Sequence, residues 1–178
     1  MPRMLNDPLL LVARLLVTML LFLFALGFIA GLSALVALPF PYVQRQIADL
    51  PLQAGVTTAD FAWRILVMLA LVLVFLAAAF LFTLYLRRII DTVSAGDPFT
   101  SLNADRLRWM GWLMMLMPFI ASAIPVIVGW INELVREAPV HDAYDLSIEG
   151  LLLALVLFIL ARVFRHGTAL RDDVEGTV

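Results

Sequence analysis

A chain of 178 residues with 63% hydrophobic and only 15% charged side chains is too poor in charge for a soluble domain, in which about a quarter of residues are normally charged. The chain contains no cysteine, which excludes disulfides, thiol nucleophiles and thiolate metal sites. The formal net charge of -2 indicates no particular charged partner.

Four apolar segments lie at residues 9–38, 62–86, 109–131 and 146–161. A helix needs about 20 apolar residues to cross a hydrocarbon core of about 30 Å, and each segment meets or approaches that length. The predicted fold class is therefore an all-α integral membrane protein with four transmembrane helices in an antiparallel bundle. We expect residues 1–178 to form a single membrane domain, with the lipid bilayer as its surroundings.

The first span carries Gly27 and Gly31 at Gly-x-x-x-Gly spacing, which lets a second helix approach closely. Two interpretations stay open, which are packing within the bundle and self-association of two chains. Arg14 lies near the inner end of this span, where its guanidinium is expected to reach the lipid headgroups.

The connection between the first two spans opens with Pro39-Phe40-Pro41, which ends the first helix. Apolar Val43 and Ile47 then fit one helical face, so a short helix on the outer membrane surface is predicted. Thr58 or Asp60 is expected to cap the start of the second span.

The second and third helices are predicted to extend beyond the bilayer as a cytoplasmic hairpin. The apolar period continues past Leu86, Gly96 offers a left-handed cap position, and Pro98 blocks continuation. Thr100 is the expected N-cap of the third helix. Each overhang would project about 12 Å at 1.5 Å per residue.

Two charge pairs are expected on the exposed surface of this hairpin, Arg87 with Asp91 and Asp105 with Arg108. Their helical spacing makes each worth only a few tenths of a kcal/mol.

Apart from Glu149 near the outer end of the fourth span, the spans contain no Asp, Glu, Lys or His. Proton relays, ion pathways and intramembrane proteases need such groups at depth, so we predict no enzymatic activity, cofactor or metal. The hydroxyls of Thr83 and Ser122 are expected to bond their own helix backbones. Pro118 and Pro125 lie on nearly the same face of the third span and predict a kink.

After the fourth span an apolar stripe continues among charged residues, which predicts an amphipathic end of the C-terminal helix. Gly167 within it either ends the helix or permits close packing against the hairpin. The acidic connection before this span is interpreted as a solvated loop.

Arginines are distributed unevenly between the two sides of the predicted bundle, and the richer side normally stays in the cytoplasm. Both termini are therefore predicted to be cytoplasmic. Trp63 and Trp130 at the outer interface, and Trp109 and Trp112 at the inner one, agree with this topology. The inner set of arginines is Arg3, Arg14, Arg87, Arg88, Arg106, Arg108, Arg162, Arg165 and Arg171, against Arg45, Arg64 and Arg136 outside.

A series of short motifs lies on the predicted cytoplasmic side, and their order and spacing along the chain are informative. These motifs are Arg87-Arg88, Gly96-Asp97-Pro98-Phe99-Thr100, Asn103, Arg106-Leu107-Arg108, Gly111-Trp112, Val163-Phe164-Arg165-His166-Gly167, Leu170-Arg171-Asp172-Asp173 and Thr177-Val178. With them the whole chain resembles a bacterial four-helix membrane family catalogued as domain of unknown function 2975. Arg162 departs from a position that is often acidic in that family, and Gly176 from one that is usually leucine.

This resemblance implies an inner-membrane protein of unknown activity, whose relatives are often encoded beside a small helix-turn-helix transcription regulator. The leading hypothesis is a non-enzymatic membrane sensor or anchor that docks such a DNA-binding regulator and does not itself bind nucleic acid. The alternative is a homo-oligomeric transporter or channel component assembled through Gly27 and Gly31. The predicted docking surface comprises Phe99, Thr100, Asn103, Arg106, Phe164, Gly167 and Arg171.

Overall fold

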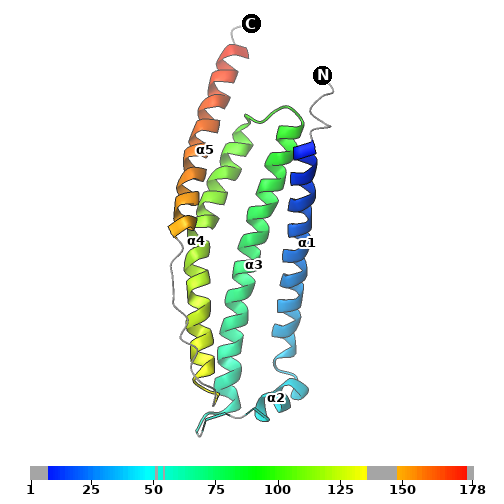
Figure 1. Ribbon diagram of the computed structural model, residues 1–178, viewed down its shortest axis with the longest axis vertical. Helices are drawn as coiled ribbons and strands as arrows, with labels where there is room; N and C mark the ends of the chain where they lie inside the picture. The colour runs from blue at the N-terminus through cyan, green and yellow to red at the C-terminus, as the bar shows by residue number, and fades with distance from the viewer. Residues whose placement is uncertain (1–7, 51, 54, 136–147, 176–178) are drawn as a thin grey trace. The chain divides into compact units, whose positions relative to one another are not determined.

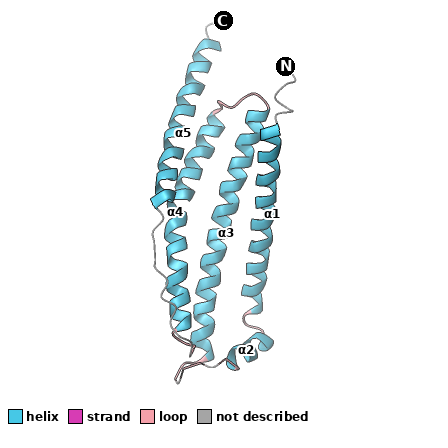
Figure 2. Cartoon of the chain, in the orientation of Figure 1, coloured by secondary structure: helices cyan, strands magenta, loops and turns pink. Residues whose placement is uncertain are grey.

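A computed structural model describes residues 8–50, 52–53, 55–135 and 148–175, and the regular structure in these ranges is helical (Figure 1). Figure 2 shows the helices and the loops that join them. Within the described ranges, the one strand-like pairing is an isolated bridge between Leu52 and Val135. The predicted all-α class is confirmed. The helices are α1 (Pro8–Ala37), α2 (Pro41–Ala48), α3 (Thr58–Ser94), α4 (Ser101–Asn132) and α5 (Ile148–Glu175).

Helices α1, α3 and α4 have 30, 37 and 32 residues and are long and apolar enough to cross a membrane. The predicted membrane class is thereby supported by three helices of the described structure. Helix α5 is less apolar, because Glu149 lies in its first turn and Arg162 follows the uncharged run 150–161. That run is only about 18 Å long. The predicted fourth span begins at residues 146–147, outside the described residues, so the count of four crossings stays a prediction.

The start of α3 corrects one predicted cap, because the N-cap is Thr57 and not Thr58 or Asp60. The Asp60 backbone N–H donates to Thr57 Oγ1 at 3.1 Å, and Asp60 Oδ2 accepts from the Thr57 hydroxyl at 2.7 Å and from its N–H at 3.1 Å. This reciprocal arrangement is a capping box with aspartate in the acidic position. The hydrogen bonds from Thr57, first from its side chain and then from its backbone, lower the pKa of Asp60.

The predicted short helix between the first two spans exists as α2, which starts with Pro41 at its first turn. Its apolar face is anchored by Ile47, which is buried in a cluster with Leu38, Phe61 and Leu134. The Gln44 side-chain amide donates to Leu38 O at 2.8 Å and so satisfies a carbonyl at the end of α1.

The described residues divide into two compact units. The α5 unit comprises residues 8–24, 78–117 and 148–175, and the α2 unit comprises residues 25–77 and 118–135. Helices α1, α3 and α4 each contribute to both units. The prediction of a single domain stays untested.

Most apolar side chains of α1 are exposed, and only Val17 and Leu21 are buried. Leu15 is 71% exposed and Phe22 68% exposed. Contiguous apolar surface of this extent is unfavourable in water but suits hydrocarbon. Helix α4 continues through Pro118 and Pro125, and the predicted kink stays a prediction.

Candidate functional site

The connection between α3 and α4 in the α5 unit is organised by Asn103, whose side chain is fully buried. Its Nδ2 donates to Thr92 Oγ1 at 2.7 Å and to Pro98 O at 2.8 Å. Its Oδ1 accepts from Arg106 Nη1 at 2.8 Å. One amide therefore fixes the end of α3, the connecting loop and the start of α4 together.

The backbone of this connection follows the sequence prediction. Gly96 has φ +82°, the left-handed conformation that glycine adopts without a Cβ penalty. The Thr100 hydroxyl accepts from the Asn103 N–H at 3.2 Å, so Thr100 caps α4 as expected.

Arg106 braces the same turn, since its Nη1 also donates to Arg88 O at 3.2 Å. A guanidinium offers five donors, and here one nitrogen is shared between the buried Asn103 amide and a backbone carbonyl of α3. Arg106 is half-buried, so its first role in this geometry is to hold the connection.

Helix α5 packs against this turn through aromatic side chains. The rings of Phe99 and Phe164 lie 5.1 Å apart between centroids, tilted by 43°. Gly167 faces the Phe99 ring so closely that a Cβ there would lie 3.0 Å from it. Of the two interpretations of Gly167, the structure supports close packing, because α5 continues through it to Glu175.

The same seam continues along α4 and α5. Leu107, Met110, Leu157 and Ala161 form its buried core. At its far end Phe158 covers Gly111, where an added Cβ would lie only 2.9 Å from the ring. Phe158 also meets Trp112 edge to face, with centroids 5.4 Å apart.

Ion pairs on the α5 unit are partly exposed and differ in part from prediction. Asp105 pairs with Arg108 at 3.4 Å, as predicted, and also with Arg165 of α5 at 3.3 Å. Asp91 pairs with Arg14 at 2.8 Å instead of with the predicted Arg87. The Asp91 oxygen involved, Oδ1, is shielded from solvent and otherwise accepts no hydrogen bond from described residues.

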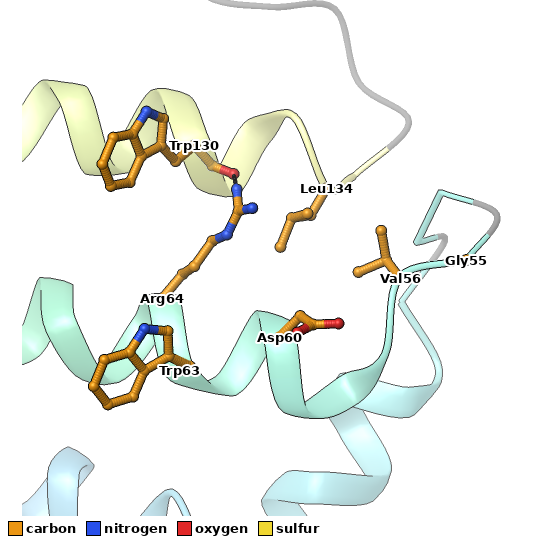
Figure 3. A pocket seen from close by; sticks show the side chains of 7 residues that line it. All are labelled: Gly55, Val56, Asp60, Trp63, Arg64, Trp130 and Leu134. Atoms are coloured by element: carbon orange, nitrogen blue, oxygen red, sulfur yellow. Dashed lines mark hydrogen bonds between the residues drawn. The ribbon is translucent and has the colours of Figure 1, made fainter.

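A second polar feature lies in the α2 unit, where a groove of about 460 Å³ opens beside the start of α3 (Figure 3). Arg64 extends across it from α3 and donates through Nη1 to Trp130 O on α4. Asp60 lies one turn before Arg64 on α3, and Trp63 and Leu134 also line the groove.

Trp63 also lines a second, apolar groove of about 640 Å³ on another side of α3. This groove reaches from Leu38 at the end of α1 past Ala62 and Leu66 to Ala70. Trp63, which is 64% exposed, therefore lines both grooves.

The family described as "Protein of unknown function (DUF2975)" matches residues 11–178 of the chain. The chain belongs to this family. The match confirms the resemblance inferred from the motifs of the chain, and the family description assigns no activity to this DUF2975 protein. Searches among curated proteins and among solved structures found no match.

The predicted docking residues of this DUF2975 protein divide by environment. Phe99, at 44% exposure, is the most open of those with a described side chain. Asn103 is buried, and Thr100, Arg106, Phe164 and Gly167 are half-buried. The side chain of Arg171 lies outside the described residues, as do Gly176, Thr177 and Val178. Their role in docking stays a prediction.

The predicted packing glycines lie in the α2 unit and face α3 of the same chain. A Cβ at Gly31 would lie 3.0 Å from Leu73, and one at Gly27 would lie 3.5 Å from Leu76. Of the two interpretations, packing within the chain is the one for which a contact exists. The hydroxyls of Thr83 and Ser122 bond carbonyls of their own helices, at 2.8 and 3.0 Å.

The polar groove was not among the predicted sites. The sequence pattern predicts Trp63 and Trp130 as interfacial aromatics and Arg64 as one of the few outer arginines. The adjacency Trp63-Arg64, four residues after Asp60, was the sequence signal for it. The pairing with Trp130 joins residues 66 positions apart, which a linear pattern does not reveal.

Proposed function

We propose that the chain is a non-enzymatic protein of a bacterial inner membrane, with four antiparallel crossings and both termini in the cytoplasm. Its α5 unit would present the α3–α4 connection and α5 as a docking platform for a small helix-turn-helix transcription regulator. The observation that carries this proposal is that Phe99, Leu102 and Leu170 of the α5 unit are exposed apolar side chains. Asn103 and Arg106 hold the α3–α4 connection in place through hydrogen bonds.

The fourth crossing is supported by one contact combined with the length of α4. Phe99 lies just before α4 and packs on Gly167 of α5. If α4 crosses the bilayer, Asn132 at its other end lies on the opposite side from Phe99. The chain must then return across the bilayer between Asn132 and Gly167.

The cytoplasmic placement of the α5 unit is supported by its arginines. Arg87 and Arg88 near the end of α3, Arg106 and Arg108 near the start of α4, and Arg165 on α5 all belong to this unit. An excess of arginine near the ends of crossings marks the cytoplasmic side.

The docking surface is proposed to centre on Phe99, Leu102 and Leu170. These side chains are 44%, 63% and 56% exposed. All three lie beyond the predicted bilayer boundary near Trp109, since Leu102 precedes that residue by about 10 Å of helix. Outside hydrocarbon, a contiguous exposed apolar patch is typical of a protein interaction site, and we propose that these three side chains form one.

The test is photo-crosslinking in living cells, from a photoreactive residue introduced at Leu102 or at Leu170. Both side chains are exposed, so the probe does not disturb the Asn103 network. A matched control probe replaces Leu15, which is 71% exposed on α1. Mass spectrometry should identify a small helix-turn-helix protein at both docking positions and not at the control.

Substitutions of the same two leucines by arginine should abolish that adduct without lowering the amount of membrane protein. Recovery of only this chain or lipid at Leu102 and Leu170 would refute the docking proposal. A regulator adduct that is equally strong from the Leu15 probe would also refute it, because contact would then be unspecific.

A further inference from the structure

The two grooves of the α2 unit together have the form of a site for an amphiphile. One groove is lined by the charged residues Asp60 and Arg64, and the other is lined mostly by apolar side chains. Their volumes, about 460 and 640 Å³, fall in the range of roughly 300–1,000 Å³ that is typical of ligand sites. Trp63 is common to both, so one bound molecule could occupy both grooves by passing over its ring.

The charges of the polar groove are available to opposite charges on a ligand. Arg64 uses one of its five N–H donors on Trp130 O in the described structure. Asp60 is held by Thr57 through Oδ2, and among the described residues it forms no ion pair with Arg64. The pair therefore offers one anion-binding and one cation-binding group.

The order of these groups along α3 matches the order of groups in a membrane leaflet. In the proposed topology Asp60 lies outermost and Arg64 about 6 Å deeper, and the apolar groove continues another 9 Å to Ala70 at 1.5 Å per residue. A phospholipid with an amine headgroup has its ammonium outermost, its phosphate deeper and its acyl chains deepest. Along α3 the carboxylate, the guanidinium and the apolar groove therefore lie in the same order as the ammonium, the phosphate and the acyl chains that they would contact.

We propose that the α2 unit binds one phospholipid of the phosphoethanolamine class, with its phosphate on Arg64, its ammonium at Asp60 and one acyl chain in the groove beside Trp63. The charge pair argues for a zwitterionic headgroup, because a glycerol headgroup carries no cation and leaves the Asp60 carboxylate without a positive partner. The apolar groove argues for a whole lipid and not for a soluble phosphate.

The test is native mass spectrometry of the full chain, purified from its membrane, stripped of lipid and reconstituted in vesicles of equal parts phosphatidylethanolamine and phosphatidylglycerol. The wild type should retain one phosphatidylethanolamine in preference to phosphatidylglycerol. Arg64→Gln should lower retention of both lipids about tenfold, the effect of losing one charge-assisted hydrogen bond.

Asp60→Asn gives a different signature, because asparagine keeps an oxygen for Thr57 but loses the negative charge. It should bring the ratio of the two retained lipids close to one. Matched controls are Arg45→Gln and Asp49→Asn, which remove exposed charges on or just after α2. Both should leave the wild-type lipid ratio and amount unchanged.

A soluble competitor separates a lipid site from a phosphate site. Glycerophosphoethanolamine, which carries the same headgroup without acyl chains, should not displace the retained lipid at equal concentration. Displacement by it would overturn the proposal, as would equal retention of the two lipids by the wild type. Unchanged retention in Arg64→Gln would overturn it as well.

Discussion

Replacement of Asn103 by leucine tests how the α3–α4 connection is held. Leucine is similar in volume but cannot hydrogen-bond, so the buried side chain loses its bonds to Thr92, Pro98 and Arg106. The position has no exposed surface, so water cannot replace these partners without a change of structure.

The expected loss follows from the partners that remain. Two neutral hydrogen bonds contribute about 0.5–1.5 kcal/mol each, and the bond to the Arg106 guanidinium about 1.5–3 kcal/mol. The Pro98 carbonyl keeps a bond from the Thr100 N–H, and Thr92 keeps its bond to Ile89 O. The connection should therefore be destabilised by an amount near the lower limit of the summed hydrogen-bond contributions, at about 2–3 kcal/mol.

Hydrogen exchange of the backbone amides in residues 95–105 measures this cost in the intact chain in nanodiscs. A loss of 2 kcal/mol raises the rate of exchange by local opening about 30-fold. The control is Asn132→Leu at the end of α4, where the asparagine side chain bonds no described residue. If exchange in 95–105 rises less than about threefold in Asn103→Leu, the Asn103 network does not hold the connection.

Three further predictions concern packing, titration and topology. Gly111→Ala should lower the midpoint of thermal unfolding by about 2–4 °C, because a Cβ there overlaps the Phe158 ring. The control, Gly27→Ala, meets only ordinary contacts and should not lower the midpoint. Equal shifts of the midpoint in the two variants would contradict this prediction. The pKa of the Asp60 carboxyl, measured by ¹³C NMR, should lie below the ordinary value of about 3.9. The capping box therefore stabilises α3 above that pH, and this stabilisation is lost as the pH falls through the lowered pKa. A pKa above the ordinary value would contradict the capping geometry. The chain contains no cysteine, so single Asp49→Cys and Ala169→Cys variants can report the topology. An impermeant maleimide should label Asp49→Cys in intact cells and Ala169→Cys only after permeabilisation. The reverse pattern would refute the proposed topology.

The sequence predicted the features that depend on local chemistry. Hydropathy located the apolar helices, and the proline at position 41 and the left-handed Gly96 marked helix ends that the structure contains. Thr100 capped α4 as expected, since capping is decided within three residues of the helix start. The α3 cap was misplaced by one residue because threonines occupy both 57 and 58.

The features that were not predicted arise from contacts between distant segments. The partner of Asp91 is Arg14, 77 positions away in the sequence, although Arg87 lies at helical spacing. The sequence likewise placed Asn103 among surface residues, yet its amide is buried because loop and helix both fold over it. In each case helical periodicity allowed several partners, and the tertiary packing selected one.

The Arg14–Asp91 pair also changes where α1 is expected to enter the bilayer. Asp91 lies five residues beyond Leu86, the predicted inner end of the second span, which corresponds to about 7.5 Å along the helix. If Asp91 lies in the headgroup region, Arg14, which pairs with it at 2.8 Å, is expected to lie there too without extending its side chain out of hydrocarbon. On that placement we expect the crossing segment of α1 to begin near Leu15, about one and a half turns after the predicted start at residue 9.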